Sequence, residues 1–452
     1  MIFSVTASGV FLLSIDGTFM PVVLPELERS FGESTTAISW VLSGFTIAQA
    51  ALLVPMGRIA DRLGRRRVFL AGLSLIVVGA AGTAASQTLT MLVASRCVVG
   101  VGAACAMPSG LGLLLSSWPE GETTRAVAAW MAVGAVAGAT GPTLGAGIVD
   151  GFGWRWAFLM SVVIGLCALA WGRRVLEDTE RDESQSFPDP VGVVLAAVML
   201  ACLTTGLVQG RSWGWTDTRV VGSLAAAVVL APVFFWRSAN HPAPVLQPEL
   251  LRLKTYRRAL MVSLLTPMTL FANFILMVQF LSRQWDYGTF RSGLAIVPFP
   301  VIAILVSLVI GRLSKRVDER SLVVAGIAIY LAGVLWFLLV PTTEPDYVRT
   351  FLPGVLLVGI GGWGTALTGI NAVTARQLND ENYSVGMGVQ ASTRQVGSLV
   401  GFGVVFGLLG ADGDAAGIDV FHQIWTVLIA VGLVAIGLTL RIERRPAVPS
   451  VT

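Results

Sequence analysis

The chain has 452 residues, of which 54% are hydrophobic and 13% are charged, and its net charge is +4. Soluble domains carry about 25% charged residues, so this composition excludes a soluble globular protein and predicts one that crosses a membrane many times. The small positive charge is not a nucleic-acid signature, and the sequence has no P-loop, metal-ligand cluster or nucleophile–base set. We therefore expect no enzymatic activity, no cofactor, no resident metal and no nucleic-acid partner.

Long apolar segments recur along the whole chain, and we expect each one to be a transmembrane helix. Backbone groups in lipid must be hydrogen-bonded within their own segment, and barrel strands would be shorter and would alternate. The fourteen predicted spans are 3–24, 36–56, 68–86, 90–115, 126–149, 156–172, 190–209, 220–236, 259–281, 292–311, 321–340, 349–373, 384–409 and 421–441.

Basic residues are distributed unevenly between the loops on the two sides of the membrane. An even number of spans places both termini on one side, and loops on that side hold 22 of the 31 lysine and arginine residues, against 7 in the opposite loops. The positive-inside rule then makes both termini cytoplasmic. We expect a multi-pass protein of the cell membrane, with the lipid bilayer as its surroundings.

Two similar loops suggest an internal repeat. Residues 57–66 follow the second predicted span, and residues 311–320 follow the tenth with a related pattern of glycine and basic residues. Pairing these loops matches the first six spans with the last six and leaves two spans inserted between them, as in transporters built from repeated bundles. The predicted units are an N-terminal six-helix bundle (1–172), a linker with two inserted helices and a connector (173–258), a C-terminal six-helix bundle (259–446) and a tail (447–452).

Two charged residues, Asp16 and Arg96, lie inside predicted spans of the first bundle. The first span runs outward to about Leu24, which places Asp16 about 12 Å below its outer end, and the fourth runs inward from about Thr90, which places Arg96 about 9 Å deep. Because an ionisable residue within a membrane usually marks a pathway, we expect the two to pair and Asp16 to carry a proton. The alternative is a static ion pair that fixes helix packing.

The loop at 57–67 combines glycines, an acid and a cluster of arginines. Gly57 and Gly64 permit tight turns, and Asp61 can pair with Arg65 or cap a helix. With Arg62, these residues form a candidate cytoplasmic latch between the bundles. The alternative is a simple orientation signal, although that would not need the acid or the glycines.

The fifth predicted span is rich in small residues at four-residue spacing, with one proline among them: Gly134, Gly138, Gly141, Pro142 and Gly145. Small residues allow helices to approach closely, and proline bends a helix. Ordinary tight packing explains the pattern as well as a functional role does.

Several polar, aromatic and methionine residues within the spans are candidates for a substrate cavity. They are Met107, Asn273, Met277, Trp363, Asn371, Gln390 and Arg394. Methionine suits loosely specified surfaces, and Arg394 would hold an anionic group or a backbone carbonyl. The alternative for each is packing within the protein or against lipid. Spans 9–14 contain no deep acid, which weakens the case for a divalent-cation substrate.

The loop Gly57-Arg58-Ile59-Ala60-Asp61-Arg62-Leu63-Gly64-Arg65-Arg66-Arg67 resembles the GxLADRxGRRR loop of the major facilitator superfamily. Ile15-Asp16-Gly17-Thr18, the stretch from Arg96 to Ala104 and the glycine-rich fifth span are similar to its fourteen-span drug:proton antiporter branch. The resemblance implies the major facilitator fold, all-α, with two six-helix bundles plus two extra transmembrane helices. It also implies that the first and fourth spans line a central cavity and that the fifth span carries an antiporter motif shaping the contact between bundles. Pro21 and Lys315 depart from the family pattern.

Together these features predict a proton-coupled exporter of hydrophobic or amphipathic small molecules such as antibiotics, working as a monomer by alternating access. One alternative is a dedicated metabolite exporter or an uptake symporter on the same fold. Another is a membrane sensor or assembly protein that transports nothing, which the absence of a soluble domain in the sequence disfavours.

Overall fold

The computed structural model describes residues 2–118, 123–177, 187–245, 248–313, 317–378, 380–409 and 417–443. The described residues do not include the tail at 447–452, residues 178–186 of the segment 173–189, or residues 314–316 of the second repeat loop. In the described part of the chain, fourteen helical stretches are long and apolar enough to cross a membrane. The predicted all-helical class and the number of spans are therefore confirmed.

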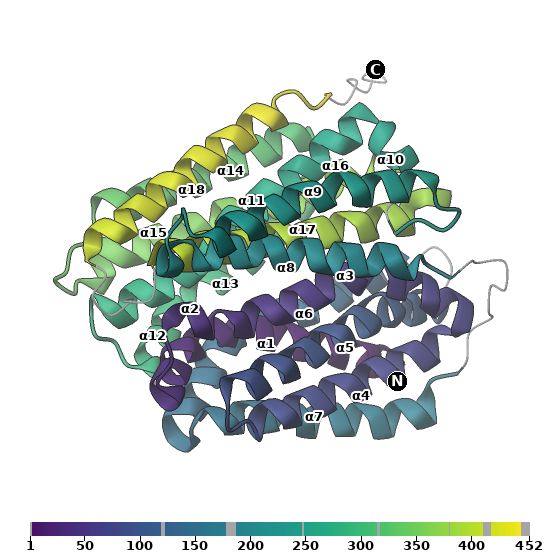
Figure 1. Ribbon diagram of the computed structural model, residues 1–452, viewed down its shortest axis with the longest axis horizontal. Helices are drawn as coiled ribbons and strands as arrows, with labels where there is room; N and C mark the ends of the chain where they lie inside the picture. The colour runs from purple at the N-terminus through teal and green to yellow at the C-terminus, as the bar shows by residue number, and fades with distance from the viewer. Residues whose placement is uncertain are drawn as a thin grey trace.

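The helices of the first half form one bundle (Figure 1). They are α1 (Ile2–Phe31), the short α2 (Thr35–Ile38) leading into α3 (Trp40–Leu63), α4 (Arg65–Ala84), α5 (Leu89–Ser116), α6 (Thr123–Phe152) and α7 (Trp154–Val175).

Two helices and a short connector follow, and then the second bundle. The connecting part comprises α8 (Pro190–Trp213), α9 (Thr218–Asn240) and α10 (Pro248–Arg252). The second bundle comprises α11 (Lys254–Arg283), α12 (Thr289–Ile296), α13 (Pro298–Leu313), α14 (Glu319–Leu339), η1 (Tyr347–Phe351), α15 (Leu352–Val358), η2 (Gly359–Ala366), α16 (Leu367–Ala375), α17 (Asp380–Leu409) and α18 (Ile418–Thr439).

The first helix is longer than its apolar segment. The sequence predicts an end near Leu24, but α1 continues through Pro25 to Phe31. Leu27 is fully buried in the core, which holds the extra turns in place. Hydropathy marks where a chain leaves lipid, and a helix supported by packing can extend beyond that point.

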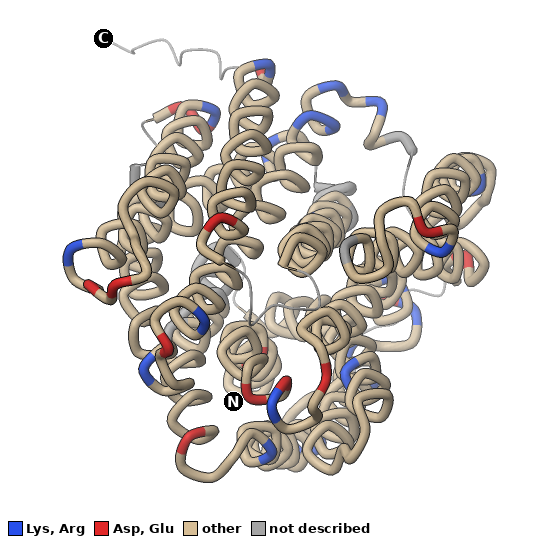
Figure 2. Tube along the Cα trace, turned by 60° about the vertical axis from the view of Figure 1, so that its left-hand side comes forward, with Lys and Arg blue, Asp and Glu red and all other residues tan. Residues whose placement is uncertain are grey.

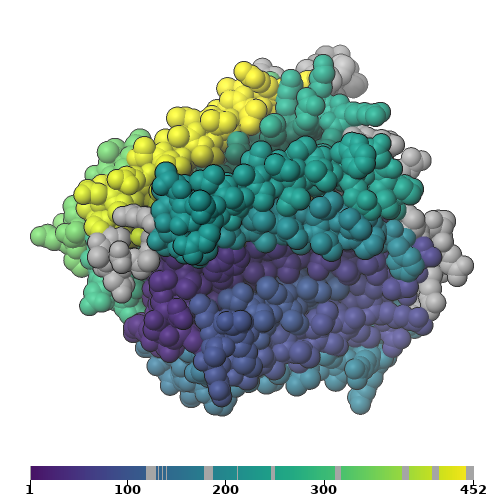
Figure 3. Space-filling view, viewed as in Figure 1, coloured from purple at the N-terminus to yellow at the C-terminus, as the bar shows by residue number. Residues whose placement is uncertain are grey.

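The inserted pair lies along the seam between the two bundles. Helix α8 packs against both α3 of the first bundle and α17 of the second, and the teal helices occupy the boundary between the purple and green halves (Figures 1 and 3). At the start of α8, the carboxylate of Asp189 accepts a hydrogen bond of 2.8 Å from Nη2 of Arg237 at the end of α9. This bond holds the pKa of Asp189 below its usual range and ties the two helices together.

The molecule has two ends along its helix axes. We call the end that carries Ile2, the loop at 57–67 and Thr439 the terminal face, and the end that carries Phe31, Thr88 and Arg283 the opposite face. Charged residues gather at helix ends and in loops, whereas the spans are mostly uncharged (Figure 2).

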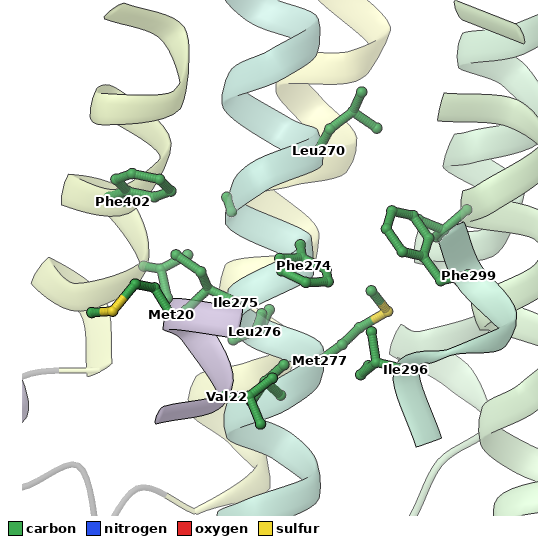
Figure 4. Close-up of a cluster of buried hydrophobic side chains, with 14 of the residues drawn as sticks. Met20, Val22, Leu270, Phe274, Ile275, Leu276, Met277, Ile296, Phe299 and Phe402 are labelled. Atoms are coloured by element: carbon green, nitrogen blue, oxygen red, sulfur yellow. The ribbon is translucent and has the colours of Figure 1, made fainter. Parts of the chain in front are cut away.

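A large apolar core joins the two bundles in the half of the molecule near the opposite face. Met20 and Val22 of α1 belong to the same buried cluster as Ile275 and Met277 of α11 and Phe402 of α17 (Figure 4). Met20 and Met277 are fully buried. The bundles are thus packed firmly together on this side of the midplane.

Candidate functional site

The predicted pairing of Asp16 with Arg96 is present in the structure. Nη1 of Arg96 donates to one carboxylate oxygen of Asp16 at 2.8 Å, and Nη2 donates to the other at 2.6 Å. Asp16 is 5% exposed and Arg96 is 1% exposed. A two-pronged bond of this kind is among the strongest that side chains form, and a buried charge needs such a partner.

The pair sits within the first bundle, between α1, α4, α5 and α7, and two aromatic rings flank it. The guanidinium carbon of Arg96 lies 5.1 Å from the ring centre of Phe45 and 5.8 Å from that of Phe158. The neighbouring residue Gly17 is exposed, and a Cβ added there would meet no atom within 4 Å. Open space therefore reaches the middle of α1 beside the pair, while the carboxylate itself points into the bundle.

Small residues pack α5, which carries Arg96, closely against α3 and α4. A Cβ on Gly100 of α5 would lie 2.4 Å from the carbonyl oxygen of Phe45, and one on Gly79 of α4 would lie 2.9 Å from the carbonyl oxygen of Ser95. Only glycine permits such approaches, so α3, α4 and α5 pack backbone to backbone. Helix α5 begins at the N-cap Thr88, which places Arg96 about two turns into the helix.

Residues 57–67 are not a long loop, because α3 continues to Leu63, Gly64 makes the turn and α4 begins at Arg65; Gly57, expected at a tight turn, lies inside α3. This region, still named the loop at 57–67, contacts its own bundle and the connectors of the inserted pair. Arg65 pairs with Asp61 at 2.9 Å and also donates to the carbonyl of Gly112 on α5 at 3.0 Å. Gly64 has a φ of 101°, which glycine adopts without strain, and it makes the turn between α3 and α4.

Two further arginines of this loop reach the connectors. Arg58 donates to the carbonyl of Pro244 at 2.7 Å, and the guanidinium carbon of Arg62 lies 4.0 Å from the ring centre of Phe187. Gly57 faces Pro108 at an ordinary contact distance. These contacts tie the loop to the segments before α8 and after α9, and the latch between the two six-helix bundles stays a prediction.

The glycines of the fifth span face α1. A Cβ on Gly141 would lie 2.2 Å from Oγ1 of Thr18, and one on Gly145 would lie 2.5 Å from Cβ of Phe19. Gly134 and Gly138 face Ser14 and Thr18 in the same way, at 3.1 and 3.7 Å. This face of α6 makes close packing within the first bundle.

Another face of α6 meets the second bundle at Pro142. A Cβ on Gly293 of α12 would lie 2.7 Å from the carbonyl oxygen of Pro142 and 2.7 Å from Cβ of Ala146. The glycine-rich span therefore serves two contacts, one within its bundle and one between the bundles.

Three of the predicted cavity residues lie near one another on α16 and α17. Gln390 donates to the side-chain oxygen of Asn371 at 2.9 Å and lies 3.4 Å from Oγ of Ser263 on α11. Arg394 is one turn further along α17 and half-buried, and the described part of the chain gives its guanidinium no hydrogen-bond acceptor. Among the residues that the structure describes, this polar cluster of the second bundle therefore contains a cation with no hydrogen-bonded partner.

The other predicted cavity residues are packed more tightly. Asn273 is fully buried and accepts a hydrogen bond of 3.1 Å from the indole of Trp425, and Met277 is fully buried in the core shown in Figure 4. Trp363 packs edge-on against Phe271 with ring centres 4.8 Å apart. Met107 is half-buried, and its sulfur accepts from Nε2 of Gln49 at 3.8 Å. Substrate contact by these four residues stays a prediction.

Two polar contacts between the bundles were not anticipated from the sequence. Gln395 of α17 donates to Oε1 of Gln49 on α3, and Gln49 is only 2% exposed. At the opposite face, Nη2 of Arg283 lies 3.0 Å from Glu28 of α1 and 2.9 Å from Thr35. Gln49 was visible as a polar residue inside a predicted span, whereas nothing in the sequence pairs Arg283 with Glu28.

Comparisons with known proteins agree with this architecture. The chain is 28% identical to the multidrug resistance protein Stp of Mycobacterium tuberculosis, over 90% of this chain and 75% of Stp. It is 29% identical to a methylenomycin A resistance protein of Streptomyces coelicolor, over 99% of this chain and 94% of that one. A crystal structure of a POT family transporter with a bound thioalcohol-conjugated peptide has the same fold, with a TM-score of 0.71 at 15% identity over 98% and 96% of the two chains. The family model described as the Major Facilitator Superfamily matches residues 6–402, and the chain belongs to this superfamily of membrane transporters.

Proposed function

We propose that the protein is a proton-coupled exporter of hydrophobic or amphipathic small molecules, antibiotics among them. The observation that carries the proposal is the buried pair of Asp16 and Arg96 beside open space at Gly17, in a chain whose relatives are named for drug resistance. These names also favour export over uptake. A transporter dedicated to one metabolite remains the second candidate, and the substrate panel below separates the two.

Proton binding at Asp16 supplies the coupling. In this conformation the carboxylate is bonded to Arg96 at both oxygens and is buried within the first bundle. With both termini in the cytoplasm, as the distribution of basic residues indicates, the opposite face is external. Each proton that moves inward releases about 2.3 kcal/mol per 100 mV of membrane potential. In the conformation described here the outer half is packed shut, so Asp16 must take up external protons in another conformation.

Alternating access requires proton and substrate to favour different states. We propose that the N-terminal bundle (1–172) carries the proton site and that the C-terminal bundle (259–446) contributes to substrate binding. The substrate-binding residues of the second bundle are Asn371, Gln390 and Arg394. The loop at 57–67 holds the two bundles together at the terminal face. A single chain contains both parts, so the functional unit is a monomer.

The test measures proton movement in everted membrane vesicles energised with an acidic interior. Adding a panel of drugs should collapse the pH gradient in vesicles with the intact protein, as reported by recovery of a quenched acridine dye. Asp16→Asn should abolish this response, and Asp16→Glu should retain part of it. The same strains, with an empty-vector control, are compared for growth inhibition by each drug.

Asp16→Asn leaves Arg96 buried without its counter-charge, which is expected to cost about 3–5 kcal/mol of stability. The double variant Asp16→Asn/Arg96→Gln removes both charges and serves as the folded control, checked by thermal unfolding. If this neutral pair still exchanged protons for drug, Asp16 would not be the proton carrier. A panel in which one compound alone elicits proton movement would identify a dedicated exporter.

A further inference from the structure

A small cavity adjoins the Asp16–Arg96 pair. Its volume is about 10 Å³, on the order of what one water molecule requires. Helices α1, α4, α5 and α7 enclose it, and its polar lining comes from Asp16, Arg96 and Ser161, with aliphatic side chains completing the wall.

Two of these polar groups are buried without a protein partner. Oγ of Ser161 and Nε of Arg96 find no hydrogen-bond partner among the described residues, although the two residues are only 5% and 1% exposed. Buried polar atoms are nearly always hydrogen-bonded, so two orphans on one cavity point to a shared partner. A cavity whose lining includes these two unpartnered atoms and the carboxylate of Asp16 meets the requirements of a bound water.

Ser161 differs from Ser74, Thr83 and Ser109, three hydroxyl residues of α4 and α5. A hydroxyl within a helix usually donates to the carbonyl four residues earlier, as Ser74, Thr83 and Ser109 do here. Ser161 makes no such bond with its own helix α7, so its hydroxyl stays available to the cavity.

We propose that Ser161 is a positioning residue of the proton site and holds a water molecule in this cavity, hydrogen-bonded to Arg96 and Asp16. The inference rests on the proposed role of Asp16 as proton carrier. When Asp16 is ionised, the water donates to its carboxylate. When Asp16 is protonated and its bonds with Arg96 weaken, the water and the Ser161 hydroxyl accept from the guanidinium, so that this buried cation keeps partners in both states.

The surroundings of Asp16 leave few other groups to set its protonation. Among the described residues, α5 contributes the charge of Arg96, α4 presents Ile76 and Ala80, and α7 presents Ser161. Helix α6 presents glycines to α1, and α3 presents the ring of Phe45 to Arg96. Loss of a hydrogen-bond donor at the cavity should therefore act directly on the carboxyl group.

The experiment follows the protonation of Asp16 without relying on transport. Dicyclohexylcarbodiimide reacts with protonated carboxyls in apolar surroundings, and mass spectrometry of the purified full-length protein quantifies the labelling of Asp16 against pH. Asp16→Asn gives the background. Ser161→Ala removes the hydroxyl, and Ser161→Val removes it and also fills the cavity, whereas Ser161→Thr keeps a hydroxyl. Ser109→Ala is the matched control, because Ser109 is fully buried and its hydroxyl is bonded to its own helix.

We expect the pH of half-maximal labelling to rise by about one unit in Ser161→Ala and Ser161→Val, because a hydrogen bond to the ionised carboxylate is lost. Ser161→Thr and Ser109→Ala should match the wild type. Unchanged midpoints in both Ser161→Ala and Ser161→Val would refute the role of Ser161 while leaving the proposed function intact. Absence of labelling above background in the wild type at every pH would instead overturn the proton-carrier role and this inference with it.

Discussion

Arg96 illustrates how one residue constrains its surroundings. Insertion scales assign an arginine at the centre of a membrane helix a cost of about 2.5–3.5 kcal/mol, and Arg96, two turns inside its span and buried, also requires specific partners. Two of its nitrogens bond to Asp16, and two aromatic rings flank the guanidinium. Removing either charge leaves the other one buried without its partner. Single substitutions at this site therefore need the double variant Asp16→Asn/Arg96→Gln as a control.

Arg394 is a cation of a different kind, because the described residues offer it no acceptor. We expect Arg394→Gln to abolish resistance to acidic compounds while largely sparing neutral ones, since a half-buried guanidinium binds carboxylates strongly. Arg394→Lys should weaken rather than abolish it, because lysine keeps the charge and loses the planar fork. Growth-inhibition panels sorted by compound charge measure this effect. Equal losses for neutral and acidic compounds would show that Arg394 is structural.

At the scale of elements, the glycine face of α6 fixes how closely α1 can approach. Gly141 and Gly145 lie where any side chain would overlap Thr18 or Phe19. The position of Asp16 on α1 therefore depends on how closely this neighbouring helix packs. The same helix, through Pro142, meets α12 of the second bundle, so α6 links the position of α1 to the seam between bundles.

We predict that Gly141→Ala lowers the stability of the protein by about 1–3 kcal/mol, as overpacking does. The reason is the 2.2 Å distance between the new Cβ and Oγ1 of Thr18, together with the carbonyl oxygen of Ile15 at 3.0 Å. Gly151→Ala on the same helix is the control, because it is exposed and its Cβ meets nothing within 4 Å. Thermal unfolding of the purified protein measures both, and adding Thr18→Ala to Gly141→Ala should recover part of the loss. A Gly141→Ala protein as stable as Gly151→Ala would contradict this packing.

At the scale of the whole molecule, the two bundles are closed against each other at the opposite face. The apolar core around Met20 and Ile275 is covered at its end by the bridge from Arg283 to Glu28. Both partners are largely buried, at 6% and 13% exposure of their side chains. Because this bridge joins α1 to α11, separating the bundles on this face must break it.

We expect Glu28→Gln to shift the protein toward a state open at the opposite face. The readout is the labelling of Gly17→Cys by an impermeant maleimide added from outside, in a background without Cys97, Cys105, Cys167 and Cys202. A tenfold increase in labelling rate corresponds to about 1.4 kcal/mol in the equilibrium between the two states. Glu26→Gln is the matched control, since Glu26 pairs within α1 with Arg29 at 3.1 Å. Equal labelling of the Glu28 and Glu26 variants would show that the bridge does not hold this face shut.

The sequence by itself determined the class of protein, the number of spans and the two charges of the buried ion pair, Asp16 and Arg96. Each of these follows from local properties, because lipid imposes a length and a polarity on every span and makes Asp16 and Arg96 conspicuous. The pattern of residues 57–67 and of the fifth span further indicated the family, which the match over residues 6–402 shows.

Tertiary structure decided which inconspicuous residues share a site. Ser161 is one serine among many until α7 brings it to the cavity beside Arg96, and the pairs Gln49–Gln395 and Glu28–Arg283 join residues hundreds of positions apart. Asn273 is conspicuous as a polar residue in a span, yet its oxygen is bonded to Trp425 inside the second bundle. The physical reason is that hydropathy encodes the depth of a residue along the membrane normal. Its direction around the helix, and hence its partners, is set by how the helices pack.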